Sequence, residues 1–157
     1  MAGFNVCEQG HVVNILPPVD LNGGKTSDYF SLKDYSHASI ILTIGVNAGA
    51  ASTITVEESD DNAGNDTTPI AFDYAKEETA AGDTLGELTS ATTDGFATHV
   101  SNSSLTYVIE IDDTQLSDGY PYLCVKASSP GASVIGSMVA VLSGSRYAGA
   151  TTPTATD

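Results

Sequence analysis

LTYVIEIDDTQLSDGYPYLCVKASSPG, residues 105–131, contains the clearest evidence for the fold. Its first part alternates apolar and polar side chains, and the apolar face is Leu105, Tyr107, Ile109 and Ile111. A period of two is typical of a β-strand with one buried face. Ser117–Gly119 predicts a turn into a second strand at Tyr120–Ala127, and Asp113–Leu116 fits a single helical turn. The stretch therefore predicts an all-β chain.

The same reading predicts about eight strands, joined by connections too short to link parallel strands. The expected strands are His11–Leu16, Tyr29–Leu32, Ser39–Val46, Ala51–Glu58, Ile70–Tyr74, Leu105–Ile111, Tyr120–Ala127 and Val134–Leu142. Ser59–Pro69 is polar and acidic, and we expect an exposed loop there. Glu77–Ser103 carries few large side chains, with short strands expected near Leu85–Leu88 and Phe96–Val100. We expect an antiparallel β-sandwich, with a jelly roll preferred over an immunoglobulin-like arrangement.

The chain divides into residues 1–18, a β-sandwich domain at 19–147 and a small polar tail at 148–157. Pro17-Pro18 should stop the first strand, and two interpretations of the preceding residues stay open. They form either an arm that adds a strand to a neighbour or the first strand of the chain's own sheet. In the arm interpretation, the partner-binding residues are Val6, Val12, Val13, Ile15 and Leu16.

The charge excludes several classes of partner. The chain has 157 residues, a net charge of −15, and only five Lys and Arg against 20 Asp and Glu. Nucleic acids and anionic membranes bind mainly through cations, so we expect neither as a partner. The charge suits an outward-facing protein or one that docks on a basic surface. We expect synthesis in a cytoplasm, with Cys7 and Cys124 reduced.

No motif predicts a catalytic, cofactor or metal site. Counting an EF-hand from Asp60 places Ala71 at the twelfth position, where a carboxylate is required. The three histidines are far apart in sequence, without zinc-ligand spacing, and there is no G-x-S-x-G elbow. We therefore expect a protein that is not an enzyme, although a hidden hydrolase site stays an alternative.

The chain resembles the head decoration, or capsid cement, proteins of tailed phages. Four segments carry the resemblance: VDLNGGKTSDYFSLKDYSHASIIL at 19–42, ASTITVEESDDNAG at 51–64, LTYVIEIDDTQLSDGYPYLCVKASSPGAS at 105–133 and VLSGSRYAG at 141–149. The resemblance implies a β-rich homotrimer that binds the major capsid protein and stabilises the outer surface of the virion. It carries over no active-site residue. The alternatives are a carbohydrate- or receptor-binding head fibre and a tail or neck structural protein.

Overall fold

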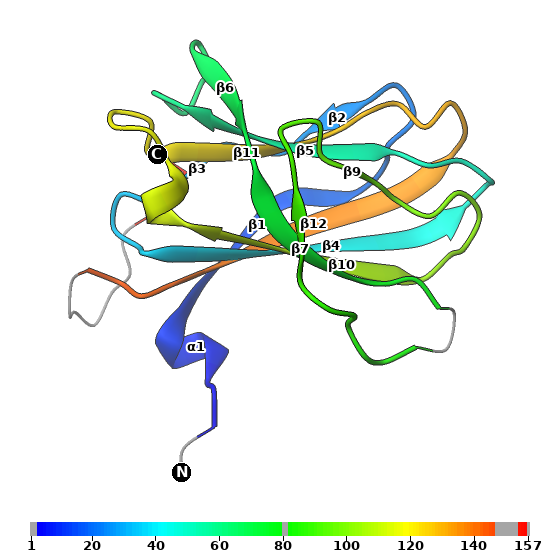
Figure 1. Cartoon of the computed structure of the whole chain (residues 1–157), viewed down its shortest axis with the longest axis horizontal. Coiled ribbons are helices and arrows are strands. Elements are labelled where there is room, and N and C mark those ends of the chain that lie inside the picture. The colour runs from blue at the N-terminus through cyan, green and yellow to red at the C-terminus, as the bar shows by residue number, and fades with distance from the viewer. Residues whose placement is uncertain (1–2, 80–81, 147–153, 157) are drawn as a thin grey trace.

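The computed structural model describes residues 3–79, 82–146 and 154–156. Two antiparallel sheets pack face to face as a β-sandwich, which Figure 1 shows as two layers. The first sheet has the order β1-β12-β4-β10-β7-β8. Its strands are β1 (Gly10–Asp20), β4 (His37–Asn47), β7 (Phe72–Glu77), β8 (Thr89–Ala91), β10 (Leu105–Asp112) and β12 (Val134–Ser143).

The second sheet has the order β2-β11-β5-β6, and β3 and β9 pair with β11 and β5 respectively. Its strands are β2 (Lys25–Thr26), β3 (Phe30–Ser31), β5 (Thr53–Ser59), β6 (Thr67–Ile70), β9 (Phe96–Ala97) and β11 (Tyr122–Ala127). Two short helices complete the elements of the described residues: α1 (Val6–Gln9) and the 3₁₀ turn η1 (Asp113–Gln115). The helical turn expected after Ile111 is therefore confirmed.

The connectivity is that of a jelly roll, which confirms the sequence prediction. The first long strand, β1, lies beside the last, β12, and β12 lies beside β4 and then β10. In the facing sheet, β2 lies beside β11, which lies beside β5 and then β6. The chain thus alternates between the sheets, as two Greek keys require. The short strands β7, β8 and β9 extend this framework.

Burial follows the predicted alternation. Along β10, every second residue from Leu105 to Ile111 is buried, and the alternate residues are half-buried. Ile54 and Val56 of β5 are also fully buried, as expected. Each large apolar side chain buried in this way stabilises the fold by about 1.5–3 kcal/mol. Phe96 stacks on Tyr74 with ring centroids 4.1 Å apart and closes the core beside β7.

Three local predictions are wrong. Pro17-Pro18 does not stop the first strand, because β1 is an edge strand and the two prolines lie at an irregularity where its register with β12 shifts between Leu16 and Val19. Ser59–Pro69 is not one loop: Ser59 is buried in β5, and Thr67–Ile70 forms β6. The expected strand at Ile70–Tyr74 breaks at Ala71, where the chain crosses between the sheets.

The structure of Glu77–Ser103, the segment with few large side chains, was predicted only in part. Phe96–Ala97 forms a strand as expected, whereas Leu85–Leu88 is exposed and lies outside any strand. The tail at 148–157 falls mostly outside the described residues. Within its described part, Ala155 is buried, and its carbonyl accepts a 2.7 Å hydrogen bond from the Ser31 N–H.

Candidate docking surface

A short N-terminal extension, residues 3–9, stands off the sandwich at the start of β1. Asn5 caps its single helical turn, because the Asn5 side chain accepts a 3.2 Å hydrogen bond from the Cys7 N–H. None of the four α1 residues is buried, and Phe4 is 69% exposed. Figure 1 shows α1 below both layers, joined to them through β1. An apolar side chain held in this way is available to a partner.

Only one edge of β1 is paired with a described strand. Among the described strands it pairs only with β12, from Gly10 opposite Ser143 to Asp20 opposite Ile135. The Ile15 carbonyl on the other edge accepts a 2.8 Å hydrogen bond from the Asp28 N–H. Pro17 and Pro18 follow without an N–H to donate. The segment Gly10–Asn14 is thus the part of this edge best suited to adding a partner's strand.

The structure separates the five residues predicted to bind a partner. Ile15 and Leu16 are buried at 1% and 7% exposure, so they belong to this chain's own core. Val13 is half-buried against the same core, and Val6 is half-buried in α1. Val12 is 54% exposed on β1. Of the two open interpretations, the structure shows a first strand within the chain's own sheet, preceded by the short extension.

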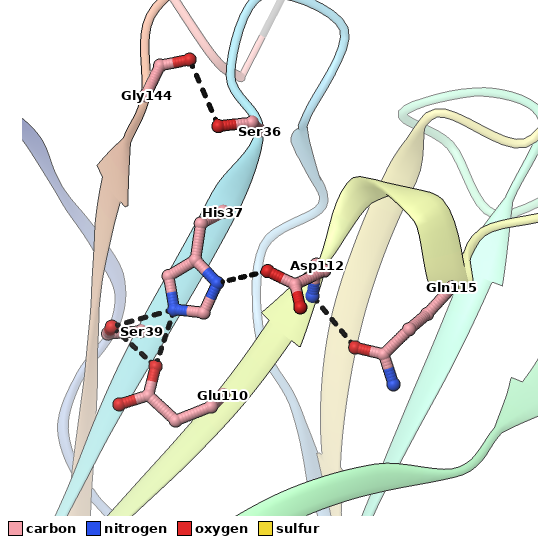
Figure 2. A network of polar contacts seen from close by, with 7 residues as sticks. All are labelled: Ser36, His37, Ser39, Glu110, Asp112, Gln115 and Gly144. Carbon is pink, nitrogen blue, oxygen red and sulfur yellow. Dashed lines mark hydrogen bonds and ion pairs between the residues drawn. The ribbon is translucent and has the colours of Figure 1, made fainter.

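The outer face of the first sheet carries a polar network that the sequence reading missed. Figure 2 shows the His37 ring between the carboxylates of Glu110 and Asp112. His37 Nδ1 lies 2.7 Å from Asp112 Oδ1, and His37 Nε2 lies 2.7 Å from Glu110 Oε2. The Ser39 hydroxyl donates a 2.6 Å hydrogen bond to the same Glu110 oxygen. Both ring nitrogens therefore face carboxylates, which accept but do not donate when ionised.

This geometry favours the doubly protonated, charged imidazole. Burial by itself lowers the pKa of His37, but the hydrogen bonds and charges of Asp112 and Glu110 outweigh it and raise the pKa above the ordinary value of 6.5. The two carboxylates come from β10, more than 70 residues along the chain, at separations of 73 and 75. The pairing of β4 with β10 brings both carboxylates to His37. A local sequence motif therefore could not predict the network.

The two cysteines have different surroundings. Cys124 is fully buried beneath Tyr29, and this burial raises the pKa of its thiol. Cys7 is exposed in α1, and the two thiols are free.

The acidic loop after β5 is organised by its own side chains. The Asp61 carboxylate accepts hydrogen bonds from the backbone N–H groups of Ala63 at 3.0 Å and Asn65 at 3.1 Å. The bond from Asn65 is the main reason that the pKa of Asp61 lies below its usual value. No group of three His, Cys, Asp or Glu side chains suited to a metal occurs among the described residues. In the described part of the chain, Asp61 acts as a turn cap.

One open cavity of about 440 Å³ lies beside η1, between Lys33 and Arg146. Arg146 pairs with Asp113 at its rim. The carboxyls whose pKa values are lowered, Asp20, Asp61 and Glu77, lie outside this cavity. Each accepts a hydrogen bond from a backbone N–H two or more residues further on, as turn caps do. The perturbed carboxyls thus have local structural roles.

The described tyrosines do not form an exposed platform for a sugar. Each is buried or half-buried, namely Tyr29, Tyr35, Tyr74, Tyr107, Tyr120 and Tyr122. The Tyr107 hydroxyl, for instance, accepts from the His99 N–H and donates to Glu78 inside the fold, both at 2.9 Å. Within the described residues, no helix is both long and apolar enough to cross a membrane.

Comparison with known proteins gives little further guidance. No protein-family model matches the chain, and no curated protein matches it. Among solved structures, the SPBc2 prophage-derived protein YomS is similar, with a TM-score of 0.43 and 11% sequence identity. The match covers 84% of this chain and 92% of that chain. At so low a score and identity, the likeness carries no argument about function.

Proposed function

We propose that this chain is a non-enzymatic virion structural protein that binds the outer surface of a phage capsid and stabilises it. The resemblance to head decoration proteins supports this proposal, and the jelly roll agrees with a β-rich structural subunit. The observation that carries it is the N-terminal extension, in which Phe4 is 69% exposed and α1 stands off the sandwich ahead of β1.

The extension suggests how attachment works. Residues 3–9 insert apolar side chains into the shell, and Gly10–Asn14 offer backbone groups to a strand of the major capsid protein. We further propose that the protein binds as a homotrimer. Three weak attachments linked in one molecule then bind with far higher avidity than one, without any new contact. The acidic body would face solvent, away from the packaged DNA.

The test uses empty shells assembled from the major capsid protein encoded in the same genome. Full-length protein should co-sediment with the shells and raise their melting temperature. A variant that lacks residues 1–9 should fold with an unchanged melting temperature, because no α1 residue is buried. It should bind the shells at least about tenfold more weakly, as expected when an apolar anchor is removed.

Two point variants sharpen the test. Phe4→Ser should weaken binding, whereas Val46→Ser should not, although both side chains are 69% exposed. If the full-length protein does not co-sediment with the shells, the proposal is overturned. Binding to isolated tail or neck assemblies instead would favour that class of virion protein, and binding to glycans would favour a head fibre.

A further inference from the structure

The outer face of the first sheet carries an apolar row that crosses β12, β4 and β10 and ends at Ala75 of β7, which is buried. The strand register aligns Val139 of β12 with Ile41 of β4, Ile41 with Val108 of β10, and Val108 with Ala75 of β7. In the next row, Val12 of β1 lies opposite Val141 of β12. Ile41 is 37% exposed and Val12 54% exposed, so solvent reaches this patch.

Carboxylates occupy the same face beside the apolar row. The row of Val12 and Val141 continues through Ser39 to Glu110 and then Asp73. The Asp112 and His37 pair lies one row further, where β10 ends. Lys76 is the only Lys or Arg in the six strands of this sheet, and its register partner is Tyr107, which lies in the core. The outward-facing positions of these strands therefore combine apolar and acidic groups with the His37 imidazolium, which bridges Glu110 and Asp112.

The apolar and acidic groups on this face indicate which kind of partner surface would fit it. A second copy of the chain would bring a further net charge of −15 against the same carboxylates, and like charges face to face cost binding energy. A surface with an apolar centre and flanking lysine or arginine would bury the apolar row and pair with the acids. Charge complementarity thus favours a basic partner.

We propose that the patch formed by Val12, Ile41, Val108, Val139 and Val141, flanked by Asp73 and Glu110, docks on a basic protein surface with an apolar centre. The inference rests on the proposed function, in which that surface belongs to the shell. It adds a second attachment face, separate from the N-terminal extension. The hydrogen bonds of Glu110 with His37 and Ser39 hold that carboxylate in place before the partner arrives.

The experiment measures binding of the full chain to the same empty shells. Ile41→Glu places a charge in the centre of the apolar row and should weaken binding about tenfold, since the partner must bury it. The matched control is Val46→Glu, which adds the same charge at a more exposed valine near the end of β4 and should bind normally. Unchanged melting temperatures would show that both variants fold.

A second pair of variants tests the charges. Asp73→Asn with Glu110→Gln should weaken binding at low salt and make it less sensitive to salt. Asp94→Asn with Asp118→Asn removes the same charge elsewhere and should leave binding unchanged. If the full-length protein binds but Ile41→Glu binds equally well, this inference fails while the proposed function stands. Loss of self-association by Ile41→Glu would identify a sister subunit as the occupant and overturn it. Wild-type protein that does not bind the shells overturns both.

Discussion

At the residue scale, His37 is the side chain whose state depends most directly on its neighbours. It is half-buried on the sheet surface and bonded through both ring nitrogens to carboxylates. Its pKa in the folded protein is raised, so the folded state binds a proton more tightly than the unfolded chain does. The stabilisation from this proton is therefore fully present below the ordinary pKa of 6.5 and is lost as the pH rises through the raised pKa.

We expect His37→Asn to show this dependence. Its melting temperature should fall furthest below the wild-type value at a pH below 6.5, and the gap should narrow as the pH rises through the raised pKa of the wild-type imidazole. Thermal denaturation followed by circular dichroism across this range measures the gap. The double variant Glu110→Gln with Asp112→Asn is the control, because it keeps the His37 imidazole but removes the two carboxylates that raise its pKa. A gap that is constant or widens with pH would contradict the assignment.

Among the elements, the turns before β9 and β11 contain glycines with a left-handed backbone. One of these glycines also lies too close to a neighbouring strand to carry a side chain. Gly95 precedes β9 and has a φ of +73°, a conformation that residues with a Cβ rarely adopt. A Cβ there would also collide with the backbone carbonyl of Ile54 in β5. Gly119 has a φ of +87°, yet a Cβ there would meet nothing. Both glycines therefore have a left-handed φ, but only Gly95 lies in close contact with a neighbouring strand.

This difference predicts unequal costs for the same substitution. Gly119→Ala should cost about 1–2 kcal/mol from the left-handed backbone alone. Gly95→Ala should cost clearly more, because β9 must also move away from β5. Urea denaturation of both variants gives the two free energies of unfolding. Equal losses would show that the turn before β9 moves aside without cost.

For the molecule as a whole, the net charge should oppose self-association. Each chain carries −15, so a homotrimer must bring together three strongly acidic subunits. The acidic outer face of the first sheet would point away from sister subunits, because like charges repel most where they approach most closely. Added salt shortens the range of this repulsion. Self-association should then depend on ionic strength.

We expect a trimer that strengthens with salt. Sedimentation equilibrium at micromolar concentration should shift from smaller species toward a trimer between about 50 mM and about 500 mM sodium chloride, since the Debye length falls several-fold. Shell binding through carboxylates should weaken over the same range, which separates the two contacts. A stable monomer at both salt concentrations would refute the trimer.

Side-chain alternation predicted the long strands and their buried faces, because it is a local property of an extended backbone. Leu105–Ile111 was predicted in this way, and the net charge of −15 follows from the composition. Tertiary structure alone decided where β1 lies, and therefore that Pro17-Pro18 stays in a strand and that Ile15 is core. It also decided the meeting of His37 with Glu110, because strand register joins positions 73 residues apart. Local periodicity carries no information about such pairing, which is fixed only when the two sheets close on one core.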